Sequence, residues 1–390
     1  MNDVDLVIIG GGIHGAGVAL AAAARGHSVR LLEKSALASG TSSRSSKLIH
    51  GGLRYLESGQ ISLVRECLTE RQILLRIAPD LVRLKPFFIP VYKQTSRRPW
   101  QIRSGLTLYA LLAGLDKSSR YQKLTRSEWA SLDGLNTENL LVVYRYYDAQ
   151  TDDAALTRAV MQTAQRYGAE LCTPAELLTA RLDNDGVAVV YRYQNREFQC
   201  RAGAIINAAG PWVNKVLDRV TPTVAPLPVD LVQGAHIVVD GRLQQGLYYV
   251  EAPADKRAVF VMPWQNRILV GTTETLFHGN PDRVQPLTEE IRYLRDTLGH
   301  YFSAYRNLDI DQIHTAFAGL RVLPRAGTDA FHRPRETTLL QDRDNKPRLV
   351  NIYGGKLTAY RVTAEKVMAC LRETLPPRQA FEDTARIALR

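Results

Sequence analysis

The sequence predicts an α/β protein in which a Rossmann-like dinucleotide-binding domain is combined with a second domain built on an antiparallel sheet. The first domain is indicated by an apolar run, residues 6–9, that leads into the pattern G-x-G-x-x-G and an alanine-rich stretch. An acidic residue, Glu33, ends the next expected strand, residues 28–32. The second domain is indicated by segments rich in β-forming residues, 224–239 and 258–271.

The glycine turn lies between the first expected strand and an expected helix, residues 16–25. In this arrangement the first glycine allows a tight turn, the second lets the backbone approach a pyrophosphate, and the third lets the helix pack on the strand. The motif does not distinguish NAD from FAD. We expect contacts with the dinucleotide from Gly10, Gly12, Ile13, His14 and Gly15, and contacts with its adenosine ribose from Glu33 and Lys34.

The composition is that of a globular protein with anionic partners. A length of 390 residues, of which 45% are hydrophobic and 23% charged, is ordinary for a soluble protein of two domains. The net charge of +11 is compatible with nucleic acid, an anionic membrane surface or a small anionic substrate. No nucleic-acid-binding motif is present, so we expect no nucleic acid partner.

The four cysteines are far apart and have neither a C-x-x-C pair nor the spacing of metal ligands. We therefore expect reduced thiols, no metal and a cytoplasmic location. The acidic first residues lead directly into the first strand and do not have the pattern of a secretory signal. No apolar run reaches the roughly 18 residues of a membrane span, so we expect any membrane contact to be at the surface.

The next elements follow in order along the chain. Residues 151–167 are expected to form a helix, because Asp152 and Asp153 suit its N-terminus and Gly168 can end it. Further expected elements are a hairpin of residues 187–193 and 197–201, an apolar strand at 204–208, and a helix at 287–302. We assign residues 1–81, 149–221 and 334–390 to the dinucleotide-binding domain, and 82–148 and 222–333 to the substrate domain.

Basic residues between 97 and 103 precede a short apolar segment, residues 106–115. Two interpretations are open for this stretch. An amphipathic helix in a membrane interface would place its aromatic side chains, Trp100 and Tyr109, near the headgroups. A core helix with solvated flanks would bury them, as short apolar runs usually do.

A serine-rich loop, residues 38–46, follows the adenosine-binding unit directly. Hydroxyl and N–H groups at this place can extend the anion-binding cradle along the pyrophosphate. The residues expected to do so are Thr41, Ser42, Ser43, Ser46, Lys47 and Leu48. The chain then carries His50, Arg54 and Tyr55 toward the reactive end of the cofactor.

Two stretches in this region carry a family resemblance. The segments G-G-G-I-H-G-A-G, from Gly10, and T-S-S-R-S-S-K-L-I-H-G-G-L-R-Y-L-E, from Thr41, resemble the FAD-dependent (respiratory) glycerol-3-phosphate dehydrogenases and the related oxidases. These enzymes belong to the D-amino-acid-oxidase-like flavoprotein superfamily. The resemblance implies FAD and a fold of the glutathione-reductase/D-amino-acid-oxidase type. Further matching motifs follow in the family order at residues 205–213, 234–239, 261–264, 271–274, 319–323 and 354–361.

The resemblance also implies a reaction, the oxidation of sn-glycerol 3-phosphate to dihydroxyacetone phosphate by hydride transfer to flavin N5. Such a site needs a base for the hydroxyl proton and fixed cations for the phosphate. His50 and His236 both match family histidines, and we favour His50 as the base and His236 as a contact of substrate or flavin. Arg321 and Arg335 are the candidates for the phosphate, because a guanidinium pairs two phosphate oxygens.

The other implied site residues fall into two groups. Lys356 is expected near the N1/O2 edge of the flavin, where a positive charge stabilises the reduced ring. Substrate contacts are expected from Arg54, Tyr55, Thr273, Arg335 and Lys356. Cofactor contacts are expected from Ala209, Gly210, Gly319, Gly355, Lys356, Leu357 and Thr358.

Two features depart from the family pattern. Glu274 stands where the bacterial dehydrogenases commonly carry Asp, and the sequence stops at Arg390, where those enzymes continue into a helical C-terminal domain. The alternatives are therefore an FAD-dependent oxidase or dehydrogenase of amino acids or 2-hydroxy acids, and a non-catalytic flavin-binding module. The resemblance further implies a quinone or another electron acceptor, peripheral attachment to the inner face of the cytoplasmic membrane, and a homodimer as one compatible assembly.

Overall fold

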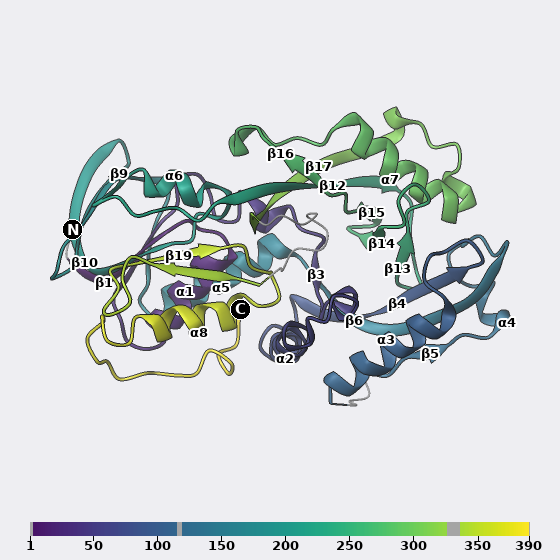
Figure 1. Ribbon diagram of the computed structural model, residues 1–390, viewed down its shortest axis with the longest axis horizontal. Coiled ribbons are helices and arrows are strands. Elements are labelled where there is room, and N and C mark those ends of the chain that lie inside the picture. Colours follow the sequence, from purple (N-terminus) through teal and green to yellow (C-terminus); the bar gives the residue numbers. More distant parts are fainter. Residues whose placement is uncertain (1–2, 115–118, 326–335, 390) are drawn as a thin grey trace.

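The computed structural model describes residues 3–114, 119–325 and 336–389. Two large sheets lie side by side along the long axis of the molecule, and the N-terminal strand belongs to the first of them (Figure 1). The site described below lies between the two sheets.

The first sheet has nine strands and carries the glycine turn. Its strands are β1 (Val4–Ile9), β2 (Val29–Leu32), β7 (Glu170–Cys172), β8 (Ala175–Leu182), β9 (Val187–Tyr193), β10 (Arg196–Asn207), β11 (Val220–Thr221), β18 (Thr338–Gln341) and β19 (Leu349–Tyr353). Their order is β11-β8-β9-β10-β1-β2-β7, with β19 beside β10 and β18 beside β19. The strands next to β1 are parallel to it, as the βαβ pattern predicts.

Three helices cover one face of this sheet: α1 (Ile13–Ala23), α5 (Asp153–Arg166) and α8 (Tyr360–Cys370) (Figure 1). Alanines make up much of the buried surface of α1, and small side chains let α5 and α8 approach it closely. Asp152 caps α5 by accepting a hydrogen bond from the Ala155 N–H at 2.8 Å.

The second sheet has ten strands. They are β3 (Leu48–Ile49), β4 (Val82–Tyr92), β5 (Gln122–Lys123), β6 (Leu140–Thr151), β12 (Val229–Asp240), β13 (Leu247–Glu251), β14 (Ala258–Trp264), β15 (Arg267–Gly271), β16 (Thr275–Phe277) and β17 (Ile313–Pro324). Their order is β16-β12-β15-β14-β13-β4-β6-β3, with β17 beside β12 and β5 beside β6. Neighbouring strands are antiparallel except for β4 and β13, which are parallel. The predicted antiparallel sheet is therefore mixed at one place.

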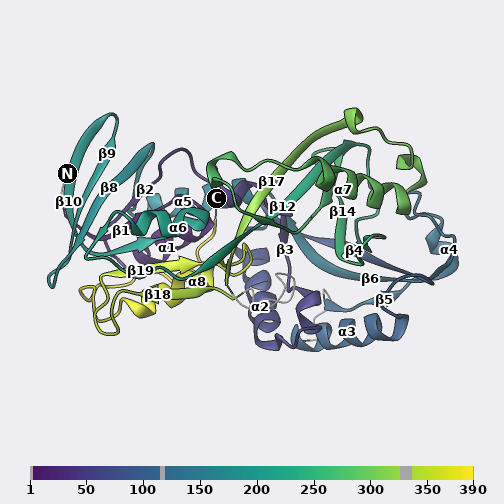
Figure 2. The same ribbon diagram turned by 45° about the horizontal axis from the view of Figure 1, so that its top comes forward.

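Helices cover both faces of the second sheet. Helices α2 (Ile61–Ile77) and α3 (Pro99–Leu112) pack on one face, and α3 runs along the outer edge of the molecule in Figure 2. The opposite face carries α7 (Thr288–Tyr301). Two short helices, α4 (Arg126–Trp129) and α6 (Val213–Leu217), lie in connections.

Most expected elements are present, and one was divided wrongly. Residues 197–201 and 204–208, expected as separate strands, are one strand, β10, which pairs with β9 through its first half and with β1 through its second. Residues 258–271 form a hairpin, β14 and β15, because Gln265 and Asn266 adopt positive φ angles and turn the chain. The helices expected at 151–167 and 287–302 correspond to α5 and α7.

We propose that the two sheets correspond to the two predicted domains. The first sheet takes its strands from residues 4–32, 170–221 and 338–353, and the second takes nearly all of its strands from 82–151 and 229–324. Strand β3 and the last residues of β6 differ from the predicted boundaries, because they pair within the second sheet.

The close contact between the glycine turn and α1 leads to a stability prediction. A Cβ at Gly15 would overlap the carbonyl oxygen of Gly10, so Gly15→Ala should lower the free energy of unfolding by about 1–3 kcal/mol. Urea denaturation measures this. The matched control is Gly105→Ala in α3, where a Cβ meets open space and should stabilise by about 1 kcal/mol. Equal stability of the Gly15 variant and the parent would contradict the close packing.

Candidate active site

A cavity of about 640 Å³ lies between the two sheets. Glu33 and Lys34 line it near the first sheet, and His50, Arg321 and Lys356 line it near the second. An elongated site with an acidic residue at one end and cations at the other is suited to a dinucleotide with a small anion beyond it.

The glycine turn forms the first end of the cavity. Gly10 has a φ of 106°, which favours glycine, and the Ile13 N–H donates to Ser42 Oγ at 2.9 Å. The Glu33 carboxylate accepts hydrogen bonds from the Gly11 N–H at 2.6 Å and from the Ser35 N–H at 2.8 Å. These two bonds leave lone pairs of the carboxylate for ribose hydroxyls.

Two residues from distant segments close the middle of the cavity. A Cβ at Gly355, which has a φ of 104°, would fall on the His14 ring. Burial lowers the pKa of His14 to about 4, and its Nδ1 is buried without a hydrogen-bond partner. The glycine thus leaves space beside a neutral imidazole, and an orphaned polar atom in a cradle without side chains fits a bound cofactor.

His236 and Arg321 lie together at the second end of the cavity. The His236 ring stacks on Phe317 with centroids 5.0 Å apart, and Ser46 Oγ lies 2.9 Å from its Nε2. Burial, with the charges of Arg321 and Lys47, lowers the pKa of His236 to about 3. The Arg321 guanidinium donates to Thr272 Oγ1 at 3.2 Å and lies 3.5 Å from a Glu274 oxygen.

His50 faces two further cations. Burial, with the charges of Lys356 and Arg54, lowers the pKa of His50 to about 3. Lys356 Nζ lies 3.6 Å from the centroid of the Tyr55 ring, and the Arg54 guanidinium lies 5.3 Å from the same centroid. The Tyr55 ring therefore holds both cations on one side of the cavity.

Most of the expected site residues line this one cavity. They are Gly10, Gly12, Ile13, His14, Glu33, Lys34, Thr41, Ser42, Ser46, Leu48, His50, Arg54, Tyr55, Ala209, Gly210, His236, Gly319, Arg321, Gly355, Lys356, Leu357 and Thr358. Their roles toward cofactor and substrate stay predictions.

Four expected residues do not line the cavity, and a fifth, Arg335, lies outside the described residues. Gly15 packs against the glycine turn. Ser43 Oγ donates to the Gly40 carbonyl at 3.3 Å. Lys47 is buried in an ion pair with Asp153 at 2.7 Å, since a buried ammonium requires a counter-charge.

The fourth of these residues is Thr273. Its hydroxyl accepts from the Ala235 N–H at 2.8 Å and donates to Glu290 at 2.7 Å, so it holds the turn after β15. Its neighbour Thr272 lines the cavity instead.

Sequence reasoning missed several cavity residues, among them Tyr146, Asp148, Tyr249 and Phe260. They come from β6, β13 and β14 and belong to no motif. The signal available in the sequence was the alternation of side chains along each strand, because every second residue of a strand faces the same side of the sheet.

The described part of the chain holds neither a metal-binding cluster nor a helix that could cross a membrane. No three His, Cys, Asp or Glu side chains there come together as a metal ion would require. None of the helices described combines the length and the apolar character that crossing a lipid bilayer requires.

Comparisons with known proteins show the family to which this chain belongs. A family model described as FAD dependent oxidoreductase matches residues 5–361. The chain is 37% identical over 374 residues to the aerobic glycerol-3-phosphate dehydrogenase of Escherichia coli (strain K12), covering 94% of this chain and 73% of that protein. It is 37% identical over 381 residues to the D-erythritol 1-phosphate dehydrogenase of Brucella abortus (strain 2308), covering 95% of this chain and 74% of that protein.

Solved structures are similar over nearly the whole chain. The glycerol-3-phosphate dehydrogenase from Bacillus halodurans complexed with FAD has a TM-score of 0.77 at 28% identity, covering 99% of this chain and 68% of that chain. The glycine oxidase from Geobacillus kaustophilus has a TM-score of 0.73 at 21% identity, covering 100% and 99%. These similarities confirm the predicted fold class.

The buried His236 leads to a prediction for stability against pH. Its pKa is lowered in the folded protein, so below pH 6.5 the unfolded chain binds a proton that the native protein does not. The resulting stability is present above pH 6.5 and is lost as the pH falls toward 3, by up to about 1.4 kcal/mol per pH unit. Urea denaturation of the FAD-free protein at pH 7 and pH 5 measures the slope.

The matched variants for this measurement are His236→Gln and His314→Gln. The first should make the loss of stability between pH 7 and 5 smaller by about 2 kcal/mol. The second removes a histidine that is exposed on β17, and it should keep the slope of the parent. Identical slopes for both variants would contradict a neutral, buried His236.

Proposed function

Because the chain belongs to the family of FAD dependent oxidoreductases, we propose that it oxidises sn-glycerol 3-phosphate to dihydroxyacetone phosphate. The observation that carries this proposal is the grouping of Arg54, Arg321 and Lys356 with His50 and His236 at one end of the cavity. The glycine turn and Glu33 lie at the other end, where the adenosine part of FAD would bind.

The FAD cofactor, when bound, supplies a hydride acceptor. The residues of this chain then have three tasks. Arg321 and Arg54 bind the phosphate and orient the alcohol, and Lys356 stabilises negative charge. His50 is uncharged at neutral pH and takes the hydroxyl proton.

The charges around His50 favour an anionic substrate. Lys356 and Arg54 contribute to the low pKa of His50 in the free protein. A phosphate that pairs with these cations offsets their charge, which raises the pKa of His50 and makes it a better base. A substrate with a carboxylate would have the same effect, so amino acids and 2-hydroxy acids are the comparison in the test. The two relatives above are both named for phosphorylated polyols.

The test is anaerobic addition of glycerol 3-phosphate to the FAD-loaded protein, which should bleach the oxidised flavin absorbance. Arg321→Met should lower kcat/KM by about 10- to 100-fold, since charged hydrogen bonds to the phosphate are lost. The control is Arg325→Met, which replaces an exposed arginine just after the same strand. Bleaching by an amino acid or a 2-hydroxy acid alone would reject the phosphate substrate, and no bleaching by any of them would favour a non-catalytic module.

We also propose that the protein binds the cytoplasmic face of a membrane and passes electrons to a quinone. Support comes from α3, whose inner face buries Ile102, Leu106 and Tyr109, and whose outer face exposes Trp100 and Leu111 by 68% and 54%. The buried side chains fit the core-helix interpretation of this stretch, and the exposed ones are compatible with the membrane-interface interpretation. Exposed apolar side chains beside basic ones suit a lipid interface.

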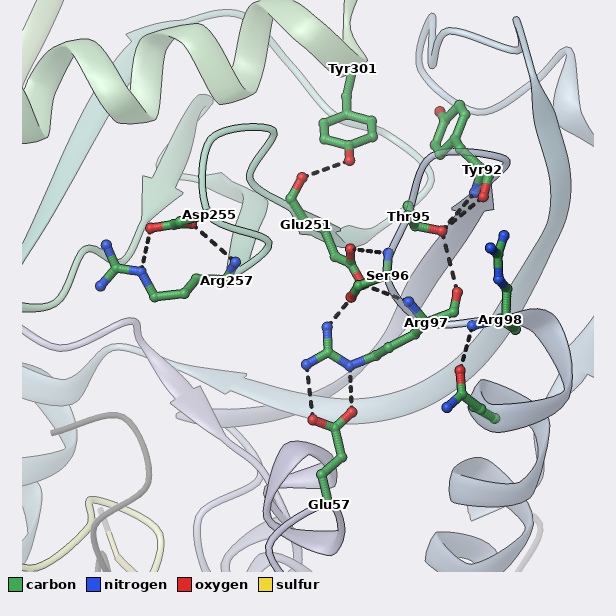
Figure 3. A network of polar contacts seen from close by, with 11 residues as sticks. Glu57, Tyr92, Thr95, Ser96, Arg97, Arg98, Glu251, Asp255, Arg257 and Tyr301 are labelled. Carbon is green, nitrogen blue, oxygen red and sulfur yellow. Dashed lines mark hydrogen bonds and ion pairs between the residues drawn. The ribbon is translucent and has the colours of Figure 1, made fainter. Parts of the chain in front are cut away.

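The basic residues near this helix differ in their contacts. Arg97 lies between Glu57 and Glu251 and bonds to both, as Figure 3 shows. Arg98 and Arg103 are exposed on α3 and at its start. The attraction to anionic lipid therefore rests on Arg98 and Arg103 and not on Arg97.

Replacing Arg98 and Arg103 by Glu should weaken binding to vesicles that contain anionic lipid by about 10-fold or more, because each basic residue contributes roughly 1 kcal/mol at such a surface. Vesicle sedimentation at low salt measures this. The control exchanges Arg181 and Arg196 for Glu on β8 and β10, at the far end of the molecule (Figure 2). Equal loss of vesicle binding in both double variants would show that binding depends on the net charge of the protein and not on the surface of α3. Unchanged binding of the variant at Arg98 and Arg103 would end the membrane proposal.

A further inference from the structure

The segment from His50 to Glu57 supplies much of the reactive end of the cavity. It carries His50, Arg54 and Tyr55, which line the cavity. The segment follows the two-residue strand β3, turns at Gly52 with a φ of 76°, and forms one short 3₁₀ turn before α2. Since so short a turn has few hydrogen bonds of its own, contacts from other elements must fix its position.

One such contact comes from Tyr109 on the inner face of α3. Its hydroxyl accepts a hydrogen bond from the Gly51 N–H at 2.8 Å and donates one to Asp148 Oδ2 at 2.7 Å. The directions are fixed, because an ionised carboxylate only accepts and an amide N–H only donates. Tyr109 therefore holds the residue next to His50 with an oriented hydroxyl.

The carboxylate behind Tyr109 is itself held. Asp148 pairs with the Arg71 guanidinium, which also donates to the Tyr147 carbonyl at 3.0 Å. Arg71, Tyr109 and Asp148 are exposed by 0%, 1% and 1%. Burying an ion pair contributes little to stability compared with an apolar replacement, so a buried cluster of this kind fits a role in positioning.

The other end of the segment is held from the same side of the molecule. Arg97, two residues before α3, donates to Glu57 Oε2 at 2.9 Å and pairs with Glu251 on β13 at 2.9 Å (Figure 3). The segment is thus tied to α3 through Gly51 near its beginning, and to Arg97, two residues before α3, through Glu57 at its end.

We propose that Tyr109, oriented by the Arg71–Asp148 ion pair, is a positioning residue that places His50 and Arg54 for the chemical step. The inference rests on the proposed function, because it takes His50 and Arg54 as the groups that meet the substrate. Tyr109 acts through the backbone of Gly51 and has no contact with substrate in this account.

The test compares the FAD-loaded parent with Tyr109→Phe, which removes one hydroxyl. We expect kcat for oxidation of glycerol 3-phosphate, measured with a dye as the electron acceptor that reoxidises the flavin, to fall by about 10- to 100-fold, as small misplacements of reacting groups cause. KM should rise by less than about threefold, since Arg321 and Lys356 lie on other elements. A loss that appears wholly in KM, or no loss, overturns the proposal.

The matched control is Tyr144→Phe. Tyr144 is also buried and, like Tyr109, does not line the cavity, but its hydroxyl donates to the Pro99 carbonyl at the start of α3 at 3.1 Å and not to the His50–Glu57 segment. This variant should keep kcat and KM within about twofold, because it removes a hydrogen bond of similar strength from the same helix. Equal losses of kcat in both variants would show a general effect on α3 and overturn the role of Tyr109.

A second measurement is independent of substrate. Hydrogen exchange of the Gly51 amide, followed with peptides that end on either side of it, should be about 2- to 10-fold faster in Tyr109→Phe than in the parent. If glycerol 3-phosphate fails to reduce the parent, the proposed function fails and the exchange rate alone decides whether Tyr109 holds Gly51. If the Gly51 amide exchanges at the same rate in Tyr109→Phe and in the parent, the proposal is overturned, whichever substrate reduces the flavin.

A second variant tests the other end of the segment. Glu57→Gln removes the charge that Arg97 pairs with, and the Glu57 side chain is half exposed, so the fold does not depend on it. We expect kcat to fall by about 2- to 5-fold with KM unchanged, in keeping with a partly exposed ion pair. If Glu57→Gln and Tyr109→Phe both keep the kcat of the parent, the inference is overturned.

Discussion

The contact between the glycine turn and α1 determines where everything else can lie. Gly10 and Gly15 touch with no room for a Cβ, and the Glu33 carboxylate bonds to the Gly11 N–H between them. Together these contacts bring the ends of β1, β2 and α1 to one point. The N-terminus of the helix and the acidic side chain then face the same cavity, which is why a dinucleotide fits there.

The opposite end of the cavity is lined by positively charged side chains that come from separate elements of the fold. Arg54, Arg321 and Lys356 would repel one another in an empty low-dielectric site, and the Tyr55 ring and Glu274 offset part of that repulsion. An anion that binds among these cations would offset the remaining repulsion between them. Burial, together with nearby cations, lowers the pKa of both histidines, so an anion bound by Lys356 and Arg54 would raise the pKa of His50.

The sequence could predict a site residue where the pattern lies within a short stretch of chain, and could not where the position depends on a contact between distant residues. The turn at Gly10 and the carboxylate of Glu33 follow a local spacing rule, and the family resemblance added His50 and Arg321. Lys47 was expected at the cofactor because it lies in a matching motif, but its contact with Asp153 arises only when the residue before β3 meets the start of α5. No local pattern could show that contact, and none could show that Tyr109 reaches Gly51, since 58 residues separate them.

Strand β10 has a consequence for how the chain is made. Leu6 pairs with Ala204, so strand β1 waits for a neighbour that is synthesised roughly 200 residues later. At about 5–20 residues per second that interval is on the order of 10–40 seconds. During this time the nascent chain has an unpaired apolar edge and an incomplete mononucleotide fold. The cofactor site that includes the end of β1 can therefore be completed only after β10 has been synthesised and has paired with β1.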